Sequence, residues 1–206
     1  MGTKIKAATR MELLRLKKKV KLATKGHKLL KEKRDALVSA FFKQIDELKA
    51  IRVEVESKLG VAFQSLVMAQ ATSGLGEIER AAGASSVAGS LGSESNNIMG
   101  VQVPKFTYEE SSGRAQGYSL AGTSLELDTA AKNFSEVLSV VIKLGEAEAT
   151  VRKLAEEIKK TKRKVNALER ILIPRLGVDI VYIKERLEEM ERENFSRLKV
   201  IKKRIS

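Results

Sequence analysis

The stretch that decides the fold runs from Leu13 to Val55 and reads LLRLKKKVKLATKGHKLLKEKRDALVSAFFKQIDELKAIRVEV. Apolar residues recur along it in a seven-residue pattern, with steps of three and four. The predicted seam residues are Leu13, Leu16, Val20, Leu30, Leu37, Phe41, Leu48 and Ile51. This repeat places them along one stripe of a helix and is typical of a coiled-coil seam. The stretch therefore predicts a long helix that packs against another helix.

Signals at both ends bound this helix. Thr9 followed by Glu12 forms a capping box, in which each side chain satisfies a free backbone N–H at a helix start. Ser73-Gly74-Leu75-Gly76 is a helix stop, because glycine readily adopts the left-handed conformation that ends helices. The first segment, 1–72, is therefore predicted to be an N-terminal coiled-coil helix.

A second coiled-coil helix is predicted for the C-terminal segment, 123–206. Thr123 and Glu126 form another capping box at its start. Its predicted seam residues include Val165, Leu168, Leu172, Ile183, Leu187 and Met190. Pro174 lies inside the pattern and removes one helical hydrogen bond, which predicts a kink, with a break into two helices as the alternative.

The central segment, 73–122, has a different composition. It holds 9 of the 14 glycines and 9 serines. Residues 97–104 could form a strand ended by Pro104, and 117–120 a return strand. The predicted fold class is all-α: a long antiparallel two-helix coiled coil with a small Gly/Ser-rich loop or β-hairpin cap at the turn. Folding about this cap brings position 72 beside 124, so the C-terminal helix should overhang the first by several turns.

Charge is distributed unevenly along the 206 residues, whose formal net charge is +13. Residues 1–34 carry 13 Lys and Arg against two Glu, and residues 152–206 carry 17 basic against 9 acidic side chains. Everything between them is mildly acidic. Aromatic residues make up only 4% and charged residues 32%, which suits long exposed helices better than a compact core.

The sequence lacks the usual marks of an enzyme site. It has no Cys, no phosphate-binding loop of the Gly-x4-Gly-Lys-Ser/Thr type, and one histidine, His27, which falls on the seam together with Arg34. His27 is more readily explained as a tolerated, hydrogen-bonded seam residue than as a proton relay. We therefore predict no catalytic, cofactor-binding or metal site.

The basic runs Lys17–Lys19 and Lys162–Lys164 fit three interpretations. They could be solvated helix faces, a surface that binds nucleic-acid phosphates, or a complement to acidic groups of a protein partner. A basic rod lying on anionic membranes is a further alternative. Because no signal peptide or 18-residue apolar run is present, we expect a soluble intracellular protein whose membrane association requires a partner.

Five stretches carry a resemblance to one family. They are TRMELLRLK at 9–17, ATKGHKLLKEKRD at 23–35, NIMGV at 97–101, RKVNALERILIP at 163–174 and IKERLEEMERE at 183–193. Together they resemble the D subunit of the A-type and V-type ATPases and ATP synthases, in order and over essentially the whole chain. The match is loosest over 73–122. The short chain favours an archaeal or bacterial complex.

This resemblance implies a non-catalytic central rotor shaft without a cofactor. Its implied partners are the A and B subunits of the ATPase head, the F subunit, and the C subunit (called d in V-type naming), which links the shaft to the membrane rotor ring. The shaft would transmit torque between head and ring at the cytoplasmic face of the membrane. The resemblance implies neither nucleic-acid binding nor direct membrane insertion.

Two sets of contact residues follow as hypotheses. The residues expected to contact the head are Arg10, Arg15, Lys18, Lys21, Lys25, Arg197 and Lys203. The apolar residues expected to contact the F subunit, on the acidic part of the chain, are Ile45, Val53, Leu66, Val67 and Phe134.

Overall fold

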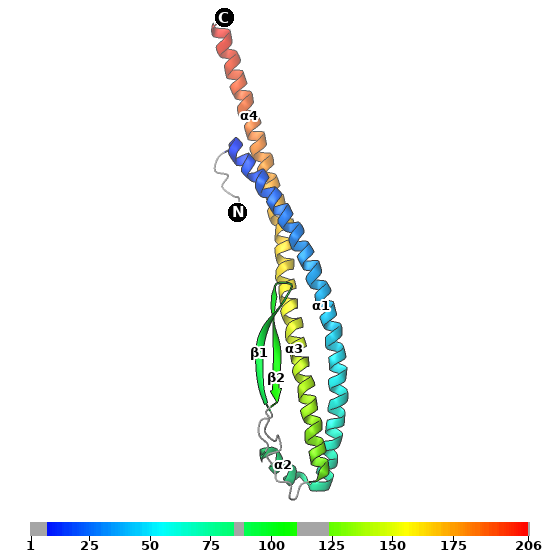
Figure 1. Cartoon of the computed structure of the whole chain (residues 1–206). Helices are drawn as coiled ribbons and strands as arrows, with labels where there is room; N and C mark the ends of the chain where they lie inside the picture. Colours follow the sequence, from blue (N-terminus) through cyan, green and yellow to red (C-terminus); the bar gives the residue numbers. More distant parts are fainter. Residues whose placement is uncertain (1–7, 85–88, 111–123, 206) are drawn as a thin grey trace. The chain divides into compact units, whose positions relative to one another are not determined.

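The computed structural model describes residues 8–84, 89–110 and 124–205 (Figure 1). The chain divides into two compact units. Unit 1 comprises Met1–Ala36 and Ile158–Ser206, and unit 2 comprises Leu37–Glu157. Each unit is described by itself below.

Helix α1 spans Arg10–Ser73 and contributes to both units. At its start the N–H of Glu12 donates to Thr9 Oγ1 at 3.2 Å, which is the capping contact predicted from the sequence. The Glu12 side chain lies 3.6 Å from Arg15. The helix ends where Gly74 adopts a positive φ of 80°, a conformation that glycine adopts without a Cβ penalty.

The returning helices are α3 (Leu125–Ala167), the π-helical turn η1 (Leu168–Leu172) and α4 (Ile173–Ile205). They follow one another without a non-helical residue, so Pro174 lies beside a change of turn type rather than at a break. The predicted cap residue Thr123 lies outside the described residues.

In unit 2, α1 and α3 run antiparallel. The rings of Phe63 and Phe134 meet edge to face with centroids 5.8 Å apart, and Asn133 Nδ2 donates to Ser65 Oγ at 3.1 Å. Their seam includes Ala62, which has no exposed surface. An alanine at this position lets the two backbones approach closely.

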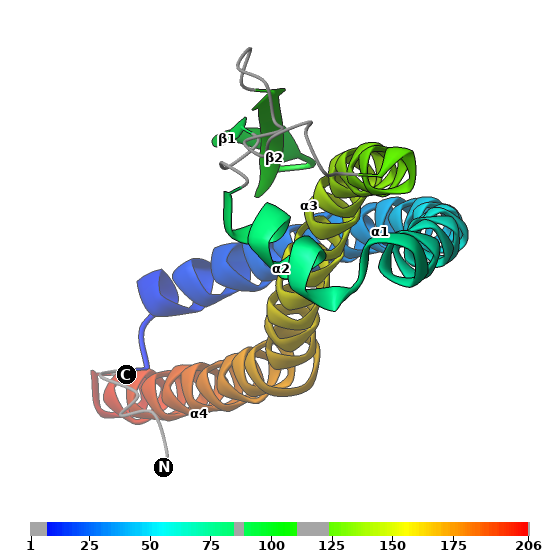
Figure 2. The same ribbon diagram turned by 90° about the horizontal axis from the view of Figure 1, so that it is seen from below.

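A short helix, α2 (Leu75–Ala84), follows α1 and was not predicted from the sequence. Its Ala81 is buried with Ala69 of α1 and Leu127 of α3, and Ile78 packs against this cluster. Figure 2 shows α2 beside the end of α1 and the start of α3. Burial of one face explains why ten residues that include two glycines remain helical.

Strands β1 (Gly89–Ile98) and β2 (Val101–Glu110) form an antiparallel hairpin, which confirms the hairpin form of the cap. The predicted position of the first strand was wrong. Residues 97–104 contain the turn itself, where Met99 and Gly100 have φ of 53° and 83°, as a tight two-residue hairpin turn requires. Pro104 lies within β2, opposite Ser95. The predicted return strand at 117–120 lies outside the described residues.

The two strands differ in burial. Residues 90–97 of β1 are exposed, whereas Val101 and Val103 of β2 are buried. The backbone N–H of Phe106 donates to Glu146 Oε2 of α3 at 3.1 Å, and Figure 1 shows the hairpin alongside α3. At Gly89 an added Cβ would lie 2.4 Å from the Glu109 carbonyl oxygen, so the close approach of the strands requires glycine there.

In unit 1, the first part of α1 runs antiparallel to η1 and α4. Arg10 forms an ion pair with Glu191, and His27 lies 3.6 Å from Glu169. Beyond Glu191 the remaining residues of α4 extend past the start of α1, and all described side chains there are exposed (Figure 1). The helical coiled coil with a hairpin, predicted from the sequence, is thus confirmed, including the overhang of the C-terminal helix.

Candidate functional site

Unit 1 carries most of the positive charge. It contains 28 of the 39 basic and 10 of the 26 acidic residues of the chain, so unit 2 is net acidic. All seven residues predicted from the sequence to contact the head lie in unit 1 and are exposed. An exposed surface with one dominant sign of charge attracts a partner of the opposite sign and speeds encounter with it.

Three of the nominated arginines have acidic neighbours in the chain. Arg10 pairs with Glu191, Arg15 lies 3.6 Å from Glu12, and Arg197 lies 3.9 Å from Glu193. The Arg10 pair joins α1 to α4 and, like the other two, is exposed to solvent. Exposed pairs of this kind contribute roughly 0–1 kcal/mol to stability, which leaves all three arginines free to exchange partners.

The lysines predicted to contact the head are Lys18, Lys21, Lys25 and Lys203. Lys18, Lys21 and Lys25 recur at steps of three and four and therefore lie on one face of α1. Within residues 8–84, 89–110 and 124–205 none of these three, nor Lys203, forms an ion pair. They are the strongest candidates for contacts with acidic groups of another protein.

The end of α4 carries an apolar stripe that was not nominated from the sequence. Phe195, Leu198, Ile201 and Ile205 follow helical spacing and are 67%, 63%, 52% and 82% exposed. Among the described residues, Lys199 places its Nζ 5.9 Å from the centroid of the Phe195 ring, and the stripe is otherwise exposed. The signal was present in the sequence, because the apolar pattern continues beyond the point where α1 begins.

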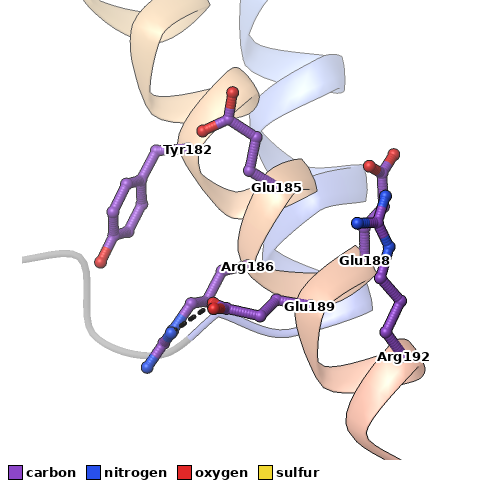
Figure 3. A pocket seen from close by; sticks show the side chains of 6 residues that line it. All are labelled: Tyr182, Glu185, Arg186, Glu188, Glu189 and Arg192. Atoms are coloured by element: carbon purple, nitrogen blue, oxygen red, sulfur yellow. Dashed lines mark hydrogen bonds and ion pairs between the residues drawn. The ribbon is translucent and has the colours of Figure 1, made fainter. Parts of the chain in front are cut away.

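A shallow hollow on α4 upstream of this stripe is lined by charged groups of both signs (Figure 3). Its lining residues are Tyr182, Glu185, Arg186, Glu188, Glu189 and Arg192. The hydrogen bond from Arg186 to Glu189 raises the pKa of that guanidinium. Neighbouring charges of opposite sign on one helix describe a solvated face rather than a catalytic arrangement.

The predicted seam residues differ in burial. The buried ones are Leu16, Leu37, Val165 and Ile183, and the half-buried ones are Leu13, Val20, Leu30, Phe41, Leu48, Ile51, Leu168 and Leu187. Two are exposed: Leu172 in the π-turn, at 41%, and Met190 near the start of the overhang, at 47%. Half-burial is expected of a two-helix seam, which water reaches from both sides.

His27 lies on the seam with a side chain that is 21% exposed. Its Nε2 is buried and has no hydrogen-bond partner among the described residues. The distance of 3.6 Å to Glu169 Oε2 is too long for a hydrogen bond. The imidazole is therefore a seam residue, but the prediction that it is hydrogen-bonded is wrong at Nε2, because no partner among the described residues lies within hydrogen-bond distance of that buried atom.

His27→Leu is expected to stabilise the protein, because it replaces this unsatisfied atom with an apolar side chain while Glu169 remains solvated. The expected gain is about 1 kcal/mol, or ~2–4 °C in melting temperature by circular dichroism. His27→Gln is the control and should give no gain. A melting temperature of His27→Leu below that of the parent would contradict an unsatisfied histidine.

The residues nominated for F-subunit contact lie in unit 2. Val53 and Val67 are 66% and 61% exposed, whereas Ile45, Leu66 and Phe134 are half-buried. Phe134 packs against Phe63, which is itself 52% exposed. The two most exposed residues of this set, Val53 and Val67, are therefore both on α1.

Membrane spans and metal clusters are both missing from the described part of the chain. No helix there combines the length and apolar character needed to cross a membrane. No group of three or more His, Cys, Asp or Glu residues among those described is placed to hold a metal ion.

Comparison with known proteins identifies relatives along almost the whole chain. The family model for the D subunit of ATP synthase matches residues 12–203. The A-type ATP synthase D subunit of Methanosphaera stadtmanae is 49% identical over 199 residues, which cover 96% of this chain and 93% of the relative. The proteins of the same name from Thermococcus gammatolerans and Pyrococcus furiosus are each 47% identical over 196 residues, with 94% and 92% covered.

Proposed function

Because this chain belongs to the ATP synthase D-subunit family, whose members are non-catalytic stalk components of the complex, we propose that it transmits torque between the ATPase head and the membrane rotor ring. The head is proposed to be a hexamer of alternating A and B subunits. ATP hydrolysis there would turn the shaft, and ion flow through the ring would turn it in the opposite sense for synthesis.

The observation that carries this proposal is the overhang of α4. The apolar stripe on this exposed, basic helix is unfavourable in water. The helix therefore suits insertion into a surrounding protein. The packed helix pair within each unit supports the same role. Twisting two packed helices against one another disturbs close-packed side chains, so the pair resists torsion and can transmit it.

The basic residues of unit 1 are proposed to contact acidic groups of the A and B subunits in turn as the shaft rotates. Exposed charged contacts can be exchanged for equivalent ones, so they do not hold the shaft at one angle. Candidate residues are Arg10, Arg15, Lys18, Lys21, Lys25, Arg197 and Lys203. Arg10 would leave Glu191 to take part.

The acidic unit 2 is proposed to bind the F subunit through exposed apolar residues of α1, with Val53 and Val67 as its centre. The C subunit (d in V-type naming) would connect the shaft to the ring. The complex would lie at the cytoplasmic face of the membrane of an archaeal or bacterial cell, and the 73–122 segment would form the cap between the coiled-coil segments 1–72 and 123–206. The archaeal relatives support that origin.

The charged contacts are tested by Lys18→Gln, Lys21→Gln and Lys25→Gln in one variant. Binding to a purified head of A and B subunits should weaken on the order of tenfold at low salt, with slower association, because electrostatic attraction is lost. Lys43→Gln, Lys132→Gln and Lys153→Gln, three lysines of unit 2, form the matched control. Biolayer interferometry gives both rate constants.

Unchanged head binding in the first variant at low salt would show that the charged face of α1 is not a head contact. A parallel titration with duplex DNA examines the other interpretation of the basic surface. Tight, steeply salt-dependent DNA binding without any head binding would contradict the proposed function and favour a nucleic-acid partner.

A further inference from the structure

The seam of unit 1 contains one residue too many for a regular repeat. Thr161 is buried and Leu168 half-buried, seven residues apart; Leu176 is half-buried and Ile183 buried, again seven apart. Between Leu168 and Leu176 the interval is eight. In a regular α-helix one extra residue rotates everything beyond it by about 100° and would remove Ile183 from the seam.

The π-turn η1 lies within this longer interval. In it the N–H of Ile173 donates to the carbonyl oxygen of Leu168, five residues earlier instead of four. A turn of this kind takes up one additional residue without rotating the helix that follows. Ile173 is consequently half-buried, while Ile171 and Leu172 are 65% and 41% exposed.

Pro174 lies directly after the same turn. It has no N–H to donate, and in a regular α-helix its ring would collide with the carbonyl of Arg170. The extra residue and Pro174 thus both weaken the helical hydrogen bonds of the same short segment of unit 1, residues 168–174. Each would by itself disturb the helix, and their adjacency confines the disturbance to a few residues.

Two glycines lie close to this level. An added Cβ at Gly26 or at Gly177 would meet no atom within 4 Å, so packing does not require either glycine. Gly26 precedes His27, which lies 3.6 Å from Glu169 of the π-turn, and Gly177 follows Pro174 by three residues. Glycine inside a helix lowers its stability relative to alanine. Helical stability is therefore reduced on both sides of the seam.

We propose that residues 168–177, with Gly26 opposite, form a joint in unit 1: a segment, created by one inserted residue, that opens and twists more easily than the helices on either side. Because η1 restores the register, Leu176 and Ile183 remain on the seam beyond it. In the proposed shaft the joint would twist when torque is applied, while the seam residues on either side of it keep their packing partners. That use rests on the proposed function, but the joint itself is a property of this chain.

Removal of the inserted residue tests the joint directly. Deletion of Ile171 together with Pro174→Ala should leave an uninterrupted seven-residue repeat and a regular α-helix. We expect a melting temperature equal to or above that of Pro174→Ala alone. The matched control deletes Lys28, an exposed residue of α1 in the same unit, in the same Pro174→Ala background. It rotates Leu13 and Leu16 off the seam and should lower the melting temperature by ~5–10 °C.

Equal losses in the two deletion variants would overturn the inserted-residue explanation. Hydrogen exchange of the pure chain supplies the second readout. In the parent, amides of 169–177 should exchange on the order of tenfold faster than those of 158–167 and 179–187, and the Ile171 deletion should abolish the difference. Equal rates in the parent would show that no joint exists. Neither measurement involves the ATPase head, so failure of the proposed function cannot be mistaken for failure of the joint.

Discussion

Removal of residues 192–206 is expected to abolish binding of the chain to a head of A and B subunits while leaving the coiled coil folded. Every described side chain in this tail is exposed, so its loss removes no packing from either unit. The tail nevertheless carries the apolar stripe formed by Phe195, Leu198, Ile201 and Ile205. Burial of such a stripe in a partner contributes several kcal/mol, at about 25 cal/mol per Å² of apolar surface.

Pull-down with the purified head and a thermal melt of the same sample check both parts of this expectation. The melting temperature should change by less than ~2 °C. Leu198→Asp with Ile201→Asp is the finer variant, because it keeps the full length and disrupts only the stripe. Head binding by the truncated chain at parental affinity would locate the contact elsewhere on unit 1.

Leu154→Ala is expected to produce the largest loss of stability of any single substitution proposed for this chain. Leu154 has no exposed surface, and truncating a fully buried leucine costs about 2–5 kcal/mol because its contacts are lost and a cavity remains. The melting temperature should fall by roughly 5–15 °C. Circular dichroism at 222 nm measures it directly.

Leu138→Ala is the matched control, since it makes the same chemical change in the same helix at a residue that is 39% exposed. It should cost less than about 1 kcal/mol. Similar losses in the two variants would mean that burial at Leu154 does not decide the stability of the seam. Both variants lie outside the surfaces proposed for head contact.

The pairing of the helices could be predicted from the sequence. The seven-residue repeat fixes which face of each helix is apolar, and a turn near 73–122 fixes which residues meet. The sequence predicts position 72 beside 124, and the structure places Ser65 against Asn133. Register is predictable here because a shift by one residue would turn the apolar stripe away from its partner.

Local structure in the central segment was harder to predict. Helix α2 contains two glycines in ten residues, and only the burial of Ala81 against Ala69 and Leu127 explains its stability. The hairpin turn places Met99 at a positive φ, a conformation that is uncommon outside Gly, Asn and Asp. In both places contacts between segments distant in sequence outweigh local propensity.

The candidate contact surfaces were partly predictable. The excess of basic residues in the two terminal segments, which form unit 1, could be predicted from the sequence, because the charge of a side chain does not depend on how it packs. Exposure of Leu172 could not be anticipated from a seven-residue template, since the extra residue becomes visible only when the spacing from Leu168 to Leu176 is measured as eight. The apolar stripe at the end of α4 was also visible in the sequence, as apolar residues on the predicted overhang, but it was not proposed there as a contact surface.

The exposed strand β1 affects how readily free copies of the chain associate with one another before they assemble with other subunits. Its residues are mainly Gly, Ser, Glu and Asn, which have low β-propensity, and in the described two-stranded sheet its outer edge is unpaired. An open edge of Val or Ile would recruit strands from other chains and seed aggregates. A polar, glycine-containing edge binds such strands poorly, so the outer edge of β1 disfavours edge-to-edge association of free copies.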